Sequence, residues 1–316
     1  MTQNIVFLDR STLQAQVRRP AFAHTWREYP VTHAAQVEER LRDASIAITN
    51  KVPLRAATLQ RLPQLKLIAV AATGYDVIDI DYCKGHGIAV ANIRNYAVHT
   101  VPEHAFTLIT ALRRNLLAYR QDVERGRWQQ VDQFTFFDHP IRDLYGATLG
   151  IVGEGVLGQG TASIARGFGM KVLFADHPPP KTDGVVFTPF DEVLAQSDVI
   201  SLHVPLTAAT RNMIGIEQFR RMKRTAILIN TARGGLVDER ALVQALTEGL
   251  IAGAGFDVLT TEPPREGNPL LELRTPNFIL TPHVAWASEG AMQILADQLI
   301  DNIEAFVNGR PQNLVT

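Results

Sequence analysis

Three side chains suited to acid–base and carboxylate chemistry lie in the second half of the sequence, each after a predicted strand: Arg233, Glu262 and His283. Hydride reduction of a ketone requires a proton donor for the developing alkoxide and a cation for the substrate carboxylate. His283 is the candidate acid, because histidine exchanges protons near neutral pH, and pairing with Glu262 would keep its imidazolium form available. Arg233, which precedes two glycines, is suited to bind a carboxylate through two parallel hydrogen bonds.

Each of these residues also has a simpler interpretation when it is taken alone. Arg233 could be a solvated surface arginine, Glu262 an ordinary loop carboxylate and His283 a capping or packing histidine. They become informative together, because each follows a strand of one series, where open α/β sheets bind ligands. Asp257, at the end of one of these strands, is a candidate to hold a nicotinamide carboxamide.

A glycine-rich segment precedes this series and has the spacing G-x-G-x-x-G between an apolar strand and a helical pattern. Gly153 would permit the tight turn, Gly155 would let a pyrophosphate approach the backbone, and Gly158 would let helix and strand pack closely. Val156 and Leu157 begin the helix, whose N-terminus offers oriented N–H groups to the pyrophosphate. Alone, the pattern could be an ordinary glycine-rich turn.

An acidic residue supports the dinucleotide interpretation. Asp176 follows the next predicted strand, at the spacing where a carboxylate accepts hydrogen bonds from the ribose hydroxyls. It would repel a 2′-phosphate, and residues 177–180 include no arginine that could pair with one. The sequence therefore predicts NAD rather than NADP as the cofactor.

The elements that must position these residues are short apolar runs alternating with helical patterns, which favours parallel sheets with crossover helices. One long helix is predicted over residues 101–119. The predicted strands are residues 5–8, 45–49, 67–70 and 88–91 in a first series, then residues 149–152, 172–174, 199–203, 226–229, 252–258 and 278–280 in a second.

Composition limits the class of protein. A length of 316 residues favours two domains, and 46% hydrophobic with 20% charged residues is typical of a globular chain. A net charge of −1 without long basic runs argues against a nucleic-acid partner. The apolar runs are too short to span a membrane, and no signal segment is recognisable. We therefore expect a cytoplasmic location. The single cysteine, Cys83, argues against an intrachain disulfide or multi-cysteine metal site, and no metal is predicted.

Several motifs are distributed along nearly the whole chain: A-T-G-Y-D at 72–76, T-V-P-E-H at 100–104, the glycine loop, L-H-V-P-L-T at 202–207, and the segments 229–235, 257–263 and 282–283. In these motifs the chain resembles the D-isomer specific 2-hydroxyacid dehydrogenase family. The resemblance implies that Arg233, Glu262 and His283 are catalytic, that Arg233 and His283 also bind substrate, and that backbone N–H groups of Thr73 and Gly74 hold the substrate carboxylate. It implies further cofactor contacts at Thr100, His203, Pro205, Thr231, Ala232 and Asp257.

The same resemblance implies a domain arrangement and an assembly. A Rossmann NAD-binding domain, residues 100–284, would be inserted in a flavodoxin-like substrate-binding domain formed by residues 1–99 and 285–316, both with doubly wound parallel sheets. The family implies a homodimer formed through the cofactor domain, with residues 124–143 reaching across. Glu154 departs from the family pattern, because an uncharged residue is commoner inside the glycine loop.

Within the family, the similarity is greatest to glycerate dehydrogenase and hydroxypyruvate (glyoxylate) reductase members. It rests on residues 119–128, Phe134 and Trp286. It implies hydroxypyruvate or glyoxylate, and D-glycerate or glycolate, as substrates. Two alternatives remain open: an NAD(H)-sensing, corepressor-like binding protein, or a relative acting on formate, phosphite or 3-phosphoglycerate. A phosphorylated substrate would require additional cations, for which Arg94 is the candidate.

Overall fold

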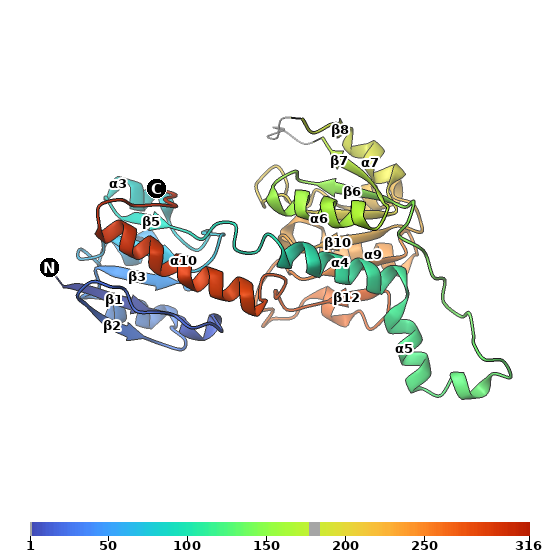
Figure 1. Cartoon of the computed structure of the whole chain (residues 1–316), viewed down its shortest axis with the longest axis horizontal. Helices are drawn as coiled ribbons and strands as arrows, with labels where there is room; N and C mark the ends of the chain where they lie inside the picture. Colours follow the sequence, from blue (N-terminus) through green and yellow to red (C-terminus); the bar gives the residue numbers. More distant parts are fainter. Residues whose placement is uncertain (1, 177–183) are drawn as a thin grey trace. The chain divides into compact units, whose positions relative to one another are not determined.

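The computed structural model of the chain describes residues 2–176 and 184–316, and the chain divides into two compact units. Unit 1 comprises Met1–Tyr96 and Ala287–Thr316, and unit 2 comprises Ala97–Trp286. Each unit is built on one parallel sheet (Figure 1). The sequence of unit 2 is therefore an insertion in the sequence of unit 1.

Unit 1 contains a five-stranded parallel sheet in the order β2-β1-β3-β4-β5, the flavodoxin-like arrangement. The strands are β1 (Gln3–Phe7), β2 (His24–Glu28), β3 (Ile46–Thr49), β4 (Leu67–Val70) and β5 (Ala89–Ala91). Every residue of β3 and β4 is buried, as expected for central strands covered on both faces. The helices are α1 (Val37–Leu41), α2 (Ala56–Leu59), α3 (Ile80–Gly85) and α10 (Glu289–Val307).

The C-terminal segment completes unit 1. Helix α10 packs against β4, and a backbone bridge joins Leu314 to Ala91 in β5. Asn302 on α10 is buried and donates a hydrogen bond to the carbonyl of Asn92, at 2.9 Å. Residues at the two ends of the sequence thus share one hydrophobic core.

Unit 2 contains a seven-stranded parallel sheet in the order β12-β11-β10-β9-β6-β7-β8, which includes the Rossmann order on either side of β6. Helices α4 and α6 pack together on one face, with α7, α8 and α9 contributing to a second core (Figure 1). The strands are β6 (Thr148–Val152), β7 (Lys171–Ala175), β8 (Phe187–Thr188), β9 (Val199–Leu202), β10 (Ile227–Asn230), β11 (Gly253–Phe256) and β12 (Phe278–Leu280). The helices are α4 (Thr100–Arg113), α5 (Leu116–Glu124), α6 (Val156–Gly167), α7 (Phe190–Gln196), α8 (Ile216–Arg221) and α9 (Glu239–Thr247).

The predicted fold class is confirmed, but two details of the secondary structure differ from the prediction. The single helix predicted over residues 101–119 is wrong: it is broken into α4 and α5, because Asn115 adopts a left-handed backbone with φ of 49°. Strands β2 and β8 were not predicted, since β2 is mostly exposed and polar and β8 has only two residues. Residues 177–180, on which the prediction of NAD rather than NADP partly depends, lie outside the described residues.

No helix in the described ranges is both long and apolar enough to cross a membrane.

Candidate active site

The glycine loop between β6 and α6 has the geometry of a pyrophosphate-binding turn. Gly153 has φ of +108°, and a Cβ there would lie 2.7 Å from the backbone of His203, so only glycine fits. A Cβ at Gly158 would overlap the carbonyl oxygen of Gly153, which shows how closely α6 approaches the loop. Gly155, by contrast, faces open space. The loop thus combines tight internal packing with room for a ligand at its middle glycine.

The amino end of α6 supplies the donors for such a ligand. Val156 is the first helical residue, Gly155 is the N-cap, no side chain caps the first turn, and no acidic residue lies in it. The first N–H groups of the helix are therefore available to an anion. Glu154, the unusual residue of the loop, is 3% exposed and so is not directed into solvent.

The remaining predicted cofactor residues lie at the carboxyl ends of neighbouring strands of unit 2. Asp176 directly follows β7 and is exposed, and its N–H donates to the Thr188 carbonyl at 2.8 Å. His203 and Pro205 follow β9, and Thr231 and Ala232 follow β10. These positions border the switch point between β6 and β9, where a Rossmann sheet binds its dinucleotide.

Two of these residues have buried polar groups that matter for a ligand. The hydroxyl of Thr231 is buried and has no hydrogen-bond partner in the part of the chain that the structure describes. The ring of His203 lies 2.9 Å, Nε2 to Oγ, from Ser201, and burial lowers the pKa of His203 to about 4. His203 is therefore neutral at physiological pH and adds no positive charge beside the glycine loop.

The loop after β10 orients Arg233. Asn230, fully buried at the strand end, accepts a hydrogen bond from the Ala232 N–H at 3.1 Å and donates to the Arg233 carbonyl at 2.9 Å. Gly234 then packs against the loop after β11 so closely that a Cβ would overlap the backbone of Leu259. Asn230 was not predicted as a site residue; a polar side chain ending an apolar strand is the signal that could have identified it.

Glu262 and His283 form the central contact of the site. Glu262 Oε2 lies 2.5 Å from His283 Nδ1, and Glu262 Oε1 accepts the Leu259 N–H at 2.7 Å. The carboxylate therefore joins the loop after β11 to the loop after β12. Because Nδ1 is engaged by Glu262, Nε2 is the ring atom left to exchange a proton with a substrate. This geometry would suit an acid–base histidine with an orienting carboxylate.

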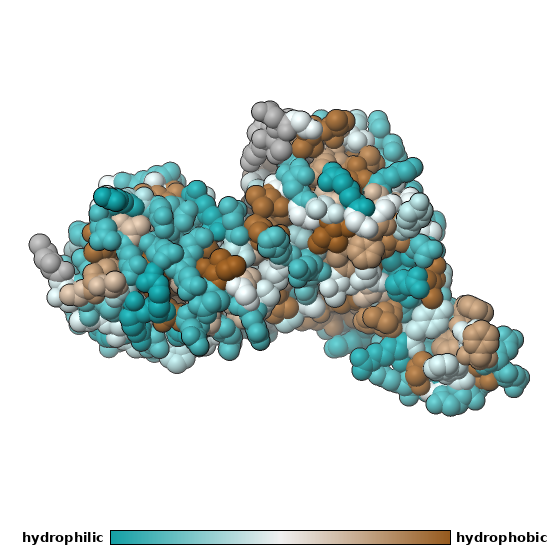
Figure 2. Space-filling model, in the orientation of Figure 1, coloured by the Kyte–Doolittle hydropathy of each residue, from teal (hydrophilic) through white to brown (hydrophobic). Residues whose placement is uncertain are grey.

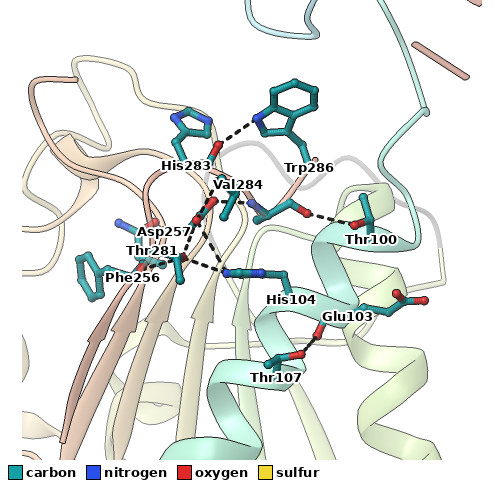
Figure 3. A network of polar contacts seen from close by, with 12 residues as sticks. Thr100, Glu103, His104, Thr107, Phe256, Asp257, Thr281, His283, Val284 and Trp286 are labelled. Atoms are coloured by element: carbon teal, nitrogen blue, oxygen red, sulfur yellow. Dashed lines mark hydrogen bonds and ion pairs between the residues drawn. The ribbon is translucent and has the colours of Figure 1, made fainter. Parts of the chain in front are cut away.

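The carboxylate of Asp257 is directed to backbone groups instead (Figure 3). It is 0% exposed and accepts the Val284 N–H at 2.9 Å, the Ala285 N–H at 2.8 Å and the Thr281 hydroxyl at 2.5 Å. Its backbone carbonyl accepts the His283 N–H at 2.7 Å. Asp257, predicted to bind nicotinamide, has its carboxylate engaged in holding the loop that contains the candidate acid.

In unit 1, Thr73 and Gly74 follow β4 at the carboxyl edge of the five-stranded sheet. The Thr73 hydroxyl donates to the Ile93 carbonyl at 2.7 Å, and Asn92 donates to the Thr73 carbonyl at 2.8 Å, so the loop is fixed from the end of β5. At the same edge, the buried carboxylate of Asp9 accepts the Lys51 N–H at 2.7 Å. The Asp9 contact was not predicted.

A cavity of about 800 Å³ lies elsewhere in unit 1 and is lined by none of the predicted site residues. It is bordered by residues 10–16 and by Glu28, Pro30, Glu289 and Gln293. The candidate site is therefore defined by the loops at the strand ends rather than by this cavity. Among the residues described, no group of three or more histidine, cysteine or acidic side chains is arranged to hold a metal ion.

Known proteins support this interpretation of the loops. Residues 106–285 match the family model of the D-isomer specific 2-hydroxyacid dehydrogenase, NAD binding domain. The chain is 58% identical to glycerate dehydrogenase of Methylorubrum extorquens over 316 residues, covering 100% of this chain and 99% of that protein. It is 38% identical to hydroxypyruvate reductase of Blautia hydrogenotrophica, covering 90% of this chain and 89% of the relative.

Solved structures of the same family are also similar to this chain in fold. D-Lactate dehydrogenase from Aquifex aeolicus, complexed with NAD and lactic acid, superposes with a TM-score of 0.81 at 32% identity, covering 97% of this chain and 96% of that one. The chain therefore belongs to the D-isomer specific 2-hydroxyacid dehydrogenase family. It is an oxidoreductase whose cofactor is NAD.

Proposed function

We propose that this enzyme reduces hydroxypyruvate or glyoxylate, and in reverse oxidises D-glycerate or glycolate. Three groups of relatives support this choice, because they are named glycerate dehydrogenase, hydroxypyruvate reductase and glyoxylate reductase. The observation that matters most is the 2.5 Å contact between Glu262 Oε2 and His283 Nδ1, because it leaves Nε2 as the ring atom that can exchange a proton with a substrate. The reaction would be hydride transfer between nicotinamide C4 and substrate C2.

His283, Glu262 and Arg233 would each have a distinct role in this reaction. A bound reduced nicotinamide would supply a hydride to substrate C2, and negative charge would then develop on the carbonyl oxygen. His283 Nε2 donates its proton to that oxygen and becomes neutral, while Glu262 holds Nδ1. Arg233 binds the substrate carboxylate and the polarised carbonyl through its fork of donors. In the oxidation direction, neutral His283 accepts the hydroxyl proton.

We assign unit 1 the role of substrate-binding domain, since the N–H groups of Thr73 and Gly74 lie at the carboxyl edge of its sheet. In unit 2, the glycine loop, residues 153–158, would hold the pyrophosphate, because it has free helical N–H groups and space at Gly155. The exposed carboxylate of Asp176 would accept hydrogen bonds from the ribose hydroxyls and would repel a 2′-phosphate. Thr100, His203, Pro205, Thr231, Ala232 and Asp257 would complete the surroundings of the cofactor.

One experiment tests substrate and cofactor together. NADH and NADPH oxidation would be followed with hydroxypyruvate, glyoxylate, pyruvate and phenylpyruvate, and NAD reduction with formate, phosphite and 3-phosphoglycerate. We expect the highest kcat/KM for hydroxypyruvate or glyoxylate with NADH, and a His283→Ala variant should lose several orders of magnitude in kcat. Tight NADH binding without turnover of any compound would support the sensing alternative instead.

We further propose a homodimer formed through unit 2. Helix α5 and residues 125–143 extend from the body of unit 2 as an arm (Figure 1). This arm displays apolar side chains to solvent, including Phe134 at 89% and Phe137 at 81% exposure (Figure 2). Aromatic side chains left exposed on a structured segment are typical of a surface that a second copy covers.

We also propose a cytoplasmic location, because the only cysteine, Cys83, is buried and unpaired, as suits a reducing compartment.

A further inference from the structure

The candidate acid, His283, has an unusual backbone. Its φ is +56°, in the left-handed region that few residues other than glycine adopt. Such a conformation persists only where surrounding contacts impose it, and it often occurs at functional sites. The residues that impose it here set the direction in which the imidazole leaves the backbone.

The contacts that impose it converge on residues 281–286, which we call the histidine loop. Asp257 accepts hydrogen bonds from two N–H groups of this loop and from Thr281, and its own carbonyl accepts the His283 N–H. A fully buried carboxylate requires such donors, because burial without them would cost several kcal/mol. Asp257 is thus one support of the loop.

Helix α4 provides the second support. His104 Nε2 lies 3.0 Å from the Thr281 hydroxyl oxygen and 3.7 Å from Asp257 Oδ1 (Figure 3). The hydroxyl has one proton, and its other neighbours, Asp257 Oδ1 at 2.5 Å and the Phe256 carbonyl at 3.4 Å, can only accept. The hydroxyl therefore donates to Asp257 and accepts from His104. This order of donors places the His104 ring proton on Nε2.

A third contact comes from the same helix, one turn earlier. The Thr100 hydroxyl donates to the carbonyl of Ala285 at 3.2 Å (Figure 3). Residues four apart lie on one face of a helix, so Thr100 and His104 present two hydrogen-bonding groups to the histidine loop. Thr100 contacts the loop after His283 and His104 contacts Thr281 before it. The two contacts therefore hold the histidine loop at positions before and after the candidate acid in the sequence.

We propose that Thr100 and His104 are positioning residues that hold the histidine loop and so direct His283 toward the substrate. The proposal rests on the proposed function, since it takes His283 as the proton donor. Neither residue needs to touch substrate or cofactor for this role. A misplacement of a catalytic group by about 1 Å can lower turnover about 100-fold. Loss of the His104 contact should therefore reduce kcat while NADH binding is retained.

The decisive pair of variants is His104→Leu and His104→Gln. Leucine removes the donor to Thr281, whereas a glutamine amide can restore a donor near the position of Nε2. We expect His104→Leu to lower kcat for the keto acid about 10- to 100-fold, with the Kd for NADH changed less than about threefold. His104→Gln should recover most of the lost turnover.

Hydrogen–deuterium exchange of peptides covering residues 281–286 supplies a readout that does not depend on activity. In His104→Leu the N–H groups of Val284 and Ala285 should exchange at least about tenfold faster than in the wild type. Thr107→Val is the matched control, because this α4 hydroxyl donates only to the Glu103 carbonyl of its own helix, at 2.9 Å. It should change neither turnover nor exchange.

Three outcomes would overturn the proposal: kcat of His104→Leu within twofold of wild type, unchanged exchange of residues 281–286, or a Kd for NADH that rises as much as kcat falls. Thr281→Val provides a second test if His104→Leu does not fold, because it removes the hydroxyl that accepts from His104 and donates to Asp257, and it should show the same pattern. Failure of the proposed function is a separate result. It would appear as a His283→Ala variant that retains turnover, while the exchange data would still test the loop.

Discussion

At the scale of single residues, burial has opposite consequences for two groups at strand ends in unit 2. Asp257 is fully buried but receives three hydrogen bonds, two of them from backbone N–H groups. His203 has one side-chain partner, Ser201, and burial lowers its pKa to about 4 from the ordinary value of 6.5. Asp257 thus organises the site, whereas His203 makes the folded state sensitive to acid.

The pH dependence attributable to His203 has a defined sign. As pH falls through about 6.5 the unfolded chain takes up a proton at this residue, but the folded chain does not do so until about pH 4. The free energy of unfolding should therefore decrease with falling pH across this window. His203→Gln keeps an amide group near Ser201 without titrating. Urea unfolding at pH 7 and pH 5 should show a smaller decrease for the variant; equal decreases would contradict the assignment.

At the scale of elements, the loops after β10 and β11 are packed against each other without space for a methyl group. Gly234 makes this contact possible, because a Cβ at this position would overlap the carbonyl carbon of Leu259 and the backbone nitrogen of Thr260. The same β11 loop places Glu262, whose Oε1 accepts the Leu259 N–H. The positions of Arg233 and Glu262 thus depend on one glycine.

A Gly234→Ala substitution tests this dependence. The added methyl group must push the two loops apart, which should cost about 1–3 kcal/mol of stability and lower kcat about 10-fold or more. Gly167→Ala is the matched control: nothing lies within 4 Å of a Cβ there, and the residue ends α6 with an ordinary φ. Thermal unfolding and steady-state kinetics on both variants would check it. A Gly234→Ala enzyme with wild-type turnover would show that the loops adjust freely.

At the scale of the whole molecule, the arm formed by α5 and residues 125–143 is ordered by its own polar contacts. Tyr119 donates to the His139 carbonyl at 2.7 Å, and Asp122 pairs with the His139 ring at 2.6 Å. Arg127 pairs with Asp138 at 2.8 Å. These contacts fix the arm while Phe134 and Phe137 stay exposed, which fits a preformed surface for a second copy of the chain.

We expect the wild-type enzyme to be a dimer by size-exclusion chromatography with light scattering, and a Phe134→Asp/Phe137→Asp variant to be a monomer. Placing two carboxylates in an apolar interface leaves them desolvated and unpaired. Val186→Asp is the control, since Val186 is 86% exposed in unit 2 but outside the arm. A wild-type monomer, or a double variant that remains dimeric, would contradict the proposed interface.

The fold class and most strands could be predicted from local composition. Parallel strands buried on both faces are continuous apolar runs, so β3, β4, β6 and β9 could be recognised from local composition. Strand β2 could not, because it lies at the edge of its sheet and pairs only with β1. The break at Asn115 was missed for a related reason: a helical pattern of apolar residues does not reveal one left-handed residue.

The sequence also indicated Arg233, Glu262, His283 and the glycine loop, because each motif lies at a strand end and its chemistry depends on residue type. Only the tertiary structure brought Glu262 and His283 to 2.5 Å, directed Asp257 to the backbone of the histidine loop, and placed Thr100 and His104 against that loop. These contacts join residues separated by 21 to 185 positions in the chain. Local sequence patterns report on neighbours along the chain, whereas such contacts depend on how the strands and α4 pack together.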